Sequence, residues 1–246
     1  ASVGERFPER AAESKKYAIR LFKNNPVIAA IKIRPKDACD SSIAGLGKFG
    51  KRGVCRDKVR GLGEGPDLVV VPRGKNLNAF AIGKYEVTVG ELNRFCSKTK
   101  KCPEIKGRNK NLPVTNVSIQ TVKDYTRWLS RKSGRKYRLP TKREWVYASN
   151  SSKRQHDSNR NCQLSSRGIQ KGGTLVNTTT GRQNTWGLVN YLGNAQELVY
   201  AKGGKLVAIG GSYKDSMEKC NVTAWVSHTG RPDGVTGFRL VRELKE

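Results

Sequence analysis

Apolar side chains recur at helical spacing in the segment that begins at Ser118 and ends at Gly134. Four of them fall on one face of a helix: Val122, Tyr125, Trp128 and Leu129. Ser118 can cap the first turn, and Gly134 can take the left-handed conformation that ends many helices. The opposite face carries Lys123, Arg127, Arg131 and Lys132. The pattern predicts an amphipathic helix that lies between the core and a basic surface.

Two further helices are predicted by capping boxes, in which a Thr is followed three residues later by a Glu. Thr88 and Glu91 begin one helix, which we expect to run to about Cys96. Thr141 and Glu144 begin the other. The side chains expected to face the core from these two helices are Leu92, Phe95, Cys96, Trp145 and Ala148.

The predicted strands are short. Residues 67–72 and 79–85 are β-branched or apolar runs, and each predicts a strand. Near the start of the chain, Glu9 to Lys23 has the spacing of a short amphipathic helix. We predict an α+β protein in three parts: an N-terminal extension (1–35) that could dock a partner, a glycine-rich lead-in closed by a disulfide (36–64) and a main domain (65–246).

Composition limits the class of protein. The 246 residues are 36% apolar and include 26 glycines, which suits one loop-rich unit. No apolar run approaches the roughly 18 residues of a membrane span. Six cysteines favour disulfides and an oxidising compartment, and the alternative is a set of buried free thiols in a cytosolic protein. The pairs expected from loop closure and from elimination are Cys39–Cys55, Cys96–Cys102 and Cys162–Cys220.

The net charge narrows the choice of partners. The chain has 48 Lys and Arg against 20 Asp and Glu, a net charge of +28 that attracts polyanions. We therefore expect an acidic protein, a glycan or another polyanion as partner. No motif of sequence-specific nucleic-acid binding accompanies the charge. The basic surface is expected to include Arg127, Arg131, Lys132, Arg135 and Lys136.

Residues 185–197, TWGLVNYLGNAQE, concentrate oxygen donors and glycines in one short stretch. Asn190 and Glu197 carry side-chain oxygens, and Gly193 lets the main chain turn so that carbonyl oxygens face the same point. Calcium, a hard cation, is bound by such oxygens. The alternative is an Asn- and Gly-rich turn that precedes a strand.

Seven pieces of the chain occur in the order typical of one family. They are GPDLVVVP (65–72), FAIGKYEVT (80–88), PVTNVS (113–118), YRLPTKREWVYA (137–148), WGLVNYLGNAQE (186–197), GGSY (210–213) and GFRLVR (237–242). The chain thereby resembles the formylglycine-generating enzymes, also called sulfatase-modifying-factor domains. The resemblance implies an elaborated C-type-lectin-like fold with short strands, two or three helices and long irregular loops. It also implies a structural calcium ion held by Asn190, Gly193, Ala195 and Glu197.

The resemblance leaves the family's oxidase chemistry incomplete. Active members bind copper(I) through two cysteines, and the matching positions here are Asp215 and Cys220. One thiolate and one carboxylate make a poor copper(I) site, so we do not expect copper. The chain has two histidines, His156 and His228, and we expect both at the surface.

Three functions stay open. We favour an extracytoplasmic, non-catalytic binding or assembly module that uses loops near 150–185 and 213–235, with residues 1–35 available to join a larger assembly. The second is a divergent copper-dependent oxidase that uses Cys220. The third is a non-specific polyanion or nucleic-acid-binding protein, whose retention would fall steeply with salt on unrelated polyanions.

Overall fold

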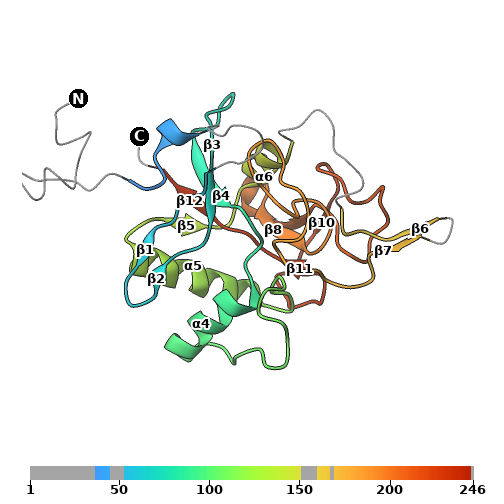
Figure 1. The fold of residues 1–246 in the computed structure, drawn as a ribbon, viewed down its shortest axis with the longest axis horizontal. Coiled ribbons are helices and arrows are strands. Elements are labelled where there is room, and N and C mark those ends of the chain that lie inside the picture. Colours follow the sequence, from blue (N-terminus) through green and yellow to red (C-terminus); the bar gives the residue numbers. More distant parts are fainter. Residues whose placement is uncertain (1–36, 45–52, 151–159, 167–168, 245–246) are drawn as a thin grey trace, which may run out of the picture.

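The computed structural model describes residues 37–44, 53–150, 160–166 and 169–244 of the chain. The helix expected between Glu9 and Lys23 lies outside the described residues, and so does His156. Figure 1 shows two small sheets, with helices α4 and α5 along one side of the first sheet. Helices and strands of this size within long irregular connections confirm the predicted α+β class.

The first sheet contains four antiparallel strands in the order β3-β4-β12-β5. They are β3 (Leu68–Val71), β4 (Phe80–Gly83), β12 (Val241–Glu243) and β5 (Tyr137–Arg138). β3 and β4 lie within the two runs predicted as strands, and all their side chains are buried. Both faces of this pair are covered, because Val70 packs into the cluster that includes α4 and α5 while Val69 packs into a separate cluster on the other side. β12, the last strand in the chain, lies between β4 and β5.

The second sheet has the strand order β10-β9-β8-β11. It consists of β8 (Gln196–Tyr200), β9 (Leu206–Ile209), β10 (Trp225–Ser227) and β11 (Thr236–Gly237). β11 runs parallel to β8, and the other pairs are antiparallel. Two small hairpins complete the described strands: β1 (Lys58–Val59) with β2 (Gly63–Glu64), and β6 (Leu164–Ser166) with β7 (Ile169–Lys171). The edge strand β10 is exposed along its whole length.

The three described α-helices begin where the sequence predicts. They are α4 (Val89–Thr99), α5 (Ile119–Ser133) and α6 (Lys142–Ser149), and two 3-10 turns, η1 (Ser41–Ile43) and η3 (Lys202–Gly204), accompany them. Both predicted capping boxes form, and Ser118 caps α5 through the main-chain N–H of Thr121. Helix α4 continues to Thr99, three residues beyond the predicted end at Cys96. It ends where Lys100 takes the left-handed conformation (φ 57°).

An aromatic cluster joins α4 and α5 to the segment between β11 and β12. The ring of Phe95 lies 5.7 Å from that of Tyr125 and 5.4 Å from that of Trp128, measured between ring centroids. Tyr125 also packs edge-on against Phe238, at 5.9 Å. Edge-to-face pairs of this kind add to the free energy gained from burying the rings. The apolar face predicted for α5 is therefore part of the core.

All six cysteines are in disulfides. The pairs are Cys39–Cys55, Cys96–Cys102 and Cys162–Cys220, as expected from the sequence. The first pair closes the lead-in on itself. Arg242 of β12 then ties the lead-in to the main domain by donating to Asp37 at 2.6 Å and to Asp57 at 3.2 Å. None of the described helices is both long and apolar enough to cross a membrane.

Candidate functional site

Glu197 is the last residue of the segment 185–197 that the sequence predicts as a calcium site. Its side chain, in β8, is 1% exposed and faces Arg239, which is fully buried. Arg239 donates from Nη2 to Oε1 and from Nε to Oε2, each at 2.7 Å, and Trp145 donates from Nε1 to Oε2 at 2.7 Å. Charge-assisted pairs with two parallel N–H donors are strong and directional. The carboxylate is therefore both neutralised and fixed in orientation.

A second buried carboxylate, Glu86, lies beneath the same segment. Its Oε1 accepts from the main-chain N–H of Ala195 at 3.0 Å, and its Oε2 accepts from Nδ2 of Asn194 at 2.9 Å. Burial raises the pKa of Glu86 to about 8, and the negative charge of Glu197 adds to the shift, although Arg239 and these two hydrogen bonds oppose it.

The main chain of the segment turns through four residues with positive φ. Gly187, Asn190, Gly193 and Asn194 have φ values of 99°, 50°, 73° and 63°. Gly193 is also required by close contact, because a Cβ atom there would lie 2.5 Å from Sγ of Cys162. Asn194 is held by its side chain, whose Oδ1 accepts from the N–H of Val176 at 2.9 Å.

The expected calcium ligands fit a cation in part. Nδ2 of Asn190 donates to the carbonyl oxygens of Asn177 and Thr178, at 3.3 and 3.2 Å. No hydrogen bond between described residues reaches Oδ1 of Asn190 or the carbonyl oxygens of Gly193 and Ala195. These three neutral oxygens suit a hard cation. Glu197 adds no unbalanced negative charge, since Arg239 already neutralises it, and the calcium assignment stays a prediction.

The two positions that match the oxidase cysteines are both engaged otherwise. Cys220 is fully buried and bonded to Cys162. The Oδ2 atom of Asp215 accepts from the main-chain N–H and the hydroxyl of Ser212, at 2.9 and 2.6 Å. No group of three or more His, Cys, Asp or Glu side chains within the described ranges could hold a metal ion.

His228 is not at the surface, which corrects the expectation from the sequence. Its side chain is 9% exposed, and its Nε2 lies 2.8 Å from Oδ2 of Asp233. Its Nδ1 accepts from the N–H of Gly230 at 2.9 Å. Although burial would raise the pKa of Asp233, hydrogen bonds from His228, Val235 and Thr236 lower it. The residues from His228 to Thr236 thus form a turn held by side chains.

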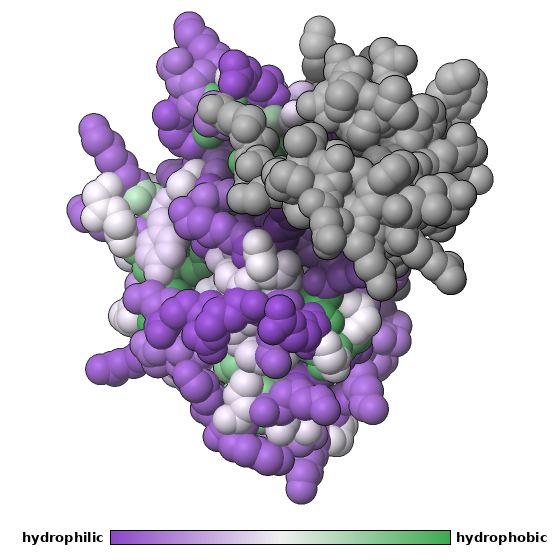
Figure 2. All heavy atoms as spheres, turned by 90° about the vertical axis from the view of Figure 1, so that its left-hand side faces the viewer, coloured by the Kyte–Doolittle hydropathy of each residue, from purple (hydrophilic) through white to green (hydrophobic). Residues whose placement is uncertain are grey.

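The five residues expected to form the basic surface lie on α5 and directly after it, and three of them are in ion pairs. Arg127 lies 3.4 Å from Asp124, Arg135 lies 3.3 Å from Asp37, and Lys136 lies 2.9 Å from Glu243. Arg131 and Lys132 are exposed. Figure 2, which views the molecule from the side of β1, β2 and α5, shows a mainly hydrophilic face with hydrophobic atoms in recesses.

A groove beside α6 is lined by further basic side chains, which the sequence pattern alone does not assign to a site. The groove has a volume of about 1120 Å³. Its lining includes Lys142, Arg143, Tyr147, Tyr200 and Lys202. We call it the α6 groove. None of its three cations forms an ion pair with a described residue, whereas its one acid, Glu144, is bound to Arg138 at 2.6 Å.

The α6 groove adjoins the exposed edge strand. Nζ of Lys142 lies 4.1 Å from the ring centroid of Trp225, within range of a cation–π interaction. Trp225 and Val226 are 49% and 53% exposed, large values for apolar side chains. Strands predicted from alternation would not have revealed this site, because its residues come from α6, η3 and β10.

The fold agrees with the comparisons to known proteins. Residues 47–244 match the model of the sulfatase-modifying factor enzyme 1-like domain, and the chain belongs to this family. The structure resembles that of PvdO from Pseudomonas aeruginosa, with 20% identity, a TM-score of 0.61 and coverage of 73% of this chain and 95% of that one.

Two further structures share the fold. The crystal structure of CarF gives 22% identity, a TM-score of 0.56 and coverage of 78% and 99% of the two chains. Treponema denticola variable protein 1 gives 17% identity, a TM-score of 0.53 and coverage of 79% and 97%. No curated protein sequence matches the chain. The predicted family and fold type are confirmed.

Proposed function

We propose that the chain is a non-catalytic binding module that acts outside the cytoplasm and takes an acidic partner in the α6 groove. The observation that carries the proposal is the set of three cations in this groove, Lys142, Arg143 and Lys202, which no described acid neutralises. Their charges are available to a ligand, whereas three of the five cations expected on the basic surface, Arg127, Arg135 and Lys136, already form ion pairs.

The disulfides support the absence of oxidase chemistry and the extracytoplasmic location. Cys220 is bonded to Cys162, so neither sulfur is a thiolate that could bind copper(I). Three disulfides in one chain are typical of proteins that mature in an oxidising compartment. A calcium ion at Asn190, Gly193 and Ala195 would have a structural role in such a module, since it would hold the segment that precedes β8.

The aromatic residues of the groove favour a partner with both negative charge and flat or apolar groups. Tyr147 and Tyr200 line the groove, and Trp225 lies at its side beneath Lys142. Aromatic side chains and cations in one groove suit an acidic peptide segment or an acidic glycan. A polyanion recognised by charge alone would not need these rings.

The experiment compares two variants that each lose three positive charges. K142Q/R143Q/K202Q changes the α6 groove, and R127Q/R131Q/K132Q changes the exposed face of α5. Binding to heparin and to a Glu- and Tyr-rich peptide is measured by calorimetry at several salt concentrations. We expect the groove variant to bind roughly ten-fold or more weakly and the α5 variant to lose much less. Equal losses in both variants would indicate non-specific binding to the whole basic surface and overturn the proposal.

A separate assay tests the oxidase alternative. The protein is reduced, loaded with copper(I) and incubated with a peptide that contains the motif CxPxR. Mass spectrometry then reports whether the cysteine becomes formylglycine. We expect the peptide to stay unchanged, because Asp215 stands where a second thiolate is needed. Conversion that is lost in C220S would overturn the non-catalytic assignment.

A further inference from the structure

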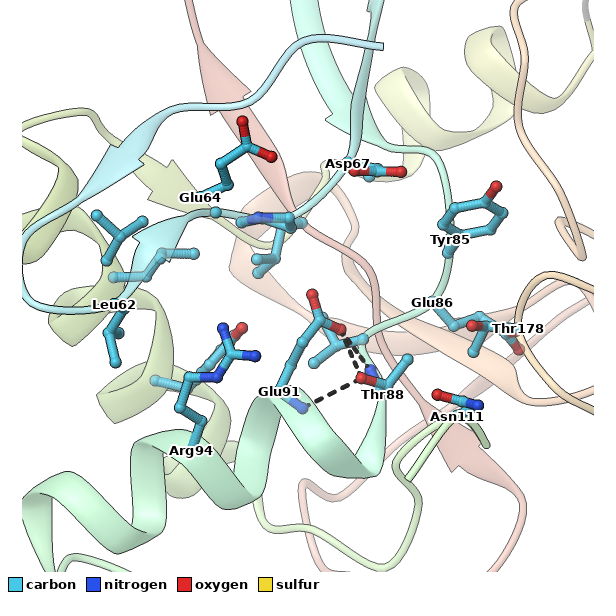
Figure 3. Close-up of a pocket in the computed structure, with 18 of the residues that line it drawn as sticks. Leu62, Glu64, Asp67, Tyr85, Glu86, Thr88, Glu91, Arg94, Asn111 and Thr178 are labelled. Carbon is cyan, nitrogen blue, oxygen red and sulfur yellow. Dashed lines mark hydrogen bonds between the residues drawn. The ribbon is translucent and has the colours of Figure 1, made fainter. Parts of the chain in front are cut away.

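A second cavity lies on another part of the molecule, between α4, α5 and the hairpin β1–β2 (Figure 3). Its volume is about 310 Å³, at the lower end of the range of about 300–1,000 Å³ found for small-molecule sites. The cavity does not include the α6 groove or Cys220. Its lining combines apolar side chains with a few charged ones, the composition typical of a site for a small organic ligand.

One charged group in this cavity is Glu91, the acid of the α4 capping box. Its Oε2 accepts from the main-chain N–H of Thr88 at 2.7 Å and from the hydroxyl of Thr88 at 2.9 Å. No hydrogen bond from a described residue reaches Oε1. Figure 3 shows this second oxygen pointing into the open space of the pocket, away from Thr88. Burial raises the pKa of Glu91, because loss of solvent disfavours the charged carboxylate more than the hydrogen bonds from Thr88 stabilise it.

The other acids that line the cavity are already engaged. Glu64 and Asp67 both bind Arg56. Glu86 accepts from Asn194 and from the main chain of Ala195. Glu64 and Asp67 thus already have a counter-charge, and both oxygens of Glu86 accept hydrogen bonds. Glu91, by contrast, forms no ion pair with a described residue, and its Oε1 is left to accept a donor from a ligand.

Arg94 supplies the opposite charge from the same helix. It follows Glu91 by three residues, lines the same cavity and is exposed. It forms no ion pair with a described residue, and its positive charge acts on Glu91 only at longer range. Neighbouring residues at this spacing commonly pair with each other. Here Glu91 and Arg94 line one cavity without forming an ion pair with each other.

The remaining wall is apolar and aromatic. Leu62 and Val59 come from the hairpin, and Tyr125, Trp128 and Leu129 come from α5. Both aromatic rings are at most 5% exposed and are held in place by the cluster around Phe95. A ligand in this cavity would thus contact a rigid apolar surface beside two opposite charges.

We propose that this cavity binds a free α-amino acid with an apolar side chain. Glu91 would accept the ammonium group through Oε1, Arg94 would donate to the carboxylate, and Tyr125, Trp128 and Leu62 would contact the side chain. A zwitterion satisfies both charges at once, which neither an amine nor a carboxylic acid can do. The inference is independent of the acidic partner proposed for the α6 groove.

The test is a calorimetric titration of the whole protein with L-phenylalanine and L-leucine, each compared with analogues that lack one charge. Phenethylamine and 3-methylbutylamine lack the carboxylate of phenylalanine and leucine, and 3-phenylpropionate and 4-methylpentanoate lack the ammonium group. We expect at least one of the two amino acids to bind, and its analogues to bind roughly ten-fold or more weakly than the amino acid itself. Failure of both amino acids to bind, or equal binding of a one-charge analogue, overturns the proposal.

Variants on α4 separate binding from folding. Gln also occurs at the third position of a capping box, so E91Q keeps the helix start while it removes the negative charge. R94Q removes the positive charge, and K98Q, on the same helix but outside the cavity, is its matched control. We expect E91Q and R94Q to weaken amino-acid binding roughly ten-fold or more, with melting temperatures close to that of the wild type, and K98Q to bind normally. Wild-type affinity in E91Q would overturn the proposal.

Discussion

Arg239 holds Glu197 in a buried ion pair, with two N–H donors of the guanidinium 2.7 Å from the two carboxylate oxygens. The same guanidinium donates to the carbonyl oxygens of Gly83 at 2.9 Å and of Val189 at 3.0 Å. One side chain therefore connects the end of β4, the segment before Asn190 and strand β8. The arrangement joins the first sheet to the second through hydrogen bonds rather than through a continuous ladder.

Removal of the acid from this pair should be costly. We expect E197A to lower the free energy of unfolding by about 3–5 kcal/mol, because Arg239 would stay buried without a counter-charge. Trp145 would also lose the acceptor of its N–H. Urea unfolding followed by tryptophan fluorescence measures the change. The control is E64Q, since Glu64 is 68% exposed and its pair with Arg56 should contribute at most about 1 kcal/mol. Similar losses in both variants would contradict the role assigned to the buried pair.

Calcium binding is tested by melting the wild-type protein in EDTA, in magnesium and in increasing calcium. A ligand that binds the folded state stabilises it by about 2.7 kcal/mol when its concentration is 100-fold above Kd. We expect the melting temperature to rise with calcium and not with magnesium, because calcium accepts irregular sets of neutral oxygens whereas magnesium demands near-octahedral geometry and gives up its water reluctantly. A melting temperature that does not change with calcium would contradict the calcium site and show that hydrogen bonds alone hold residues 190–197.

Two glycines with the same backbone angle offer a matched pair of substitutions. Gly193 has φ +73° and a Cβ there would meet Sγ of Cys162 at 2.5 Å, whereas Gly203 has φ +75° and open space around it. We expect G203A to cost only the left-handed penalty of about 1–2 kcal/mol. G193A should cost clearly more, because the Cys162–Cys220 disulfide must also shift. Equal decreases in the free energy of unfolding for G193A and G203A would show that Cys162 can move away from a Cβ atom at position 193 at little cost.

The buried acid Glu86 should make stability depend on pH. Its pKa is raised from an ordinary 4.5 to about 8, so folding takes up a proton between these values. The native state binds more protons than the unfolded state in this window, and we expect the free energy of unfolding to fall as pH rises through it, by at most about 1.4 kcal/mol per pH unit. The lowered pKa values of Glu144 and Glu243 act below pH 4.5 and leave this window unaffected.

The measurement is urea unfolding at about pH 5.5 and about pH 8.5, in wild type and in E86Q. E86Q cannot take up the proton, so its stability should change less between the two pH values. An identical pH dependence in both proteins would assign the effect to other groups.

Local signals in the sequence predicted the helices well and the second sheet poorly. A capping box involves residues three apart, so Thr88 and Thr141 mark helix starts without knowledge of the rest of the chain. The second sheet depends on partners distant in sequence, such as Glu197 beside Gly237, and its strands are only two to five residues long. Periodicity cannot be read from strands of that length.

The candidate sites show the same division. The segment 185–197 was singled out because its composition is unusual, yet the partner of Glu197 is Arg239, which lies far along the chain. The α6 groove and the cavity beside Glu91 were not predicted, because each forms where three separate elements meet. The sequence does predict that Glu91 caps the start of α4. Only the structure shows that the cap uses one carboxylate oxygen, Oε2, and leaves Oε1 facing the cavity.

The central place of β12 has a consequence for the order of folding. Strands β4 and β5 cannot pair with each other, because β12 lies between them and supplies the hydrogen bonds for both. The first sheet thus cannot be completed before β12, which follows the other described strands in the chain, has been synthesised. Until then β4 has one open edge, a surface that invites pairing with other chains. A sheet built this way assembles late, in one step that depends on the arrival of β12 rather than strand by strand along the chain.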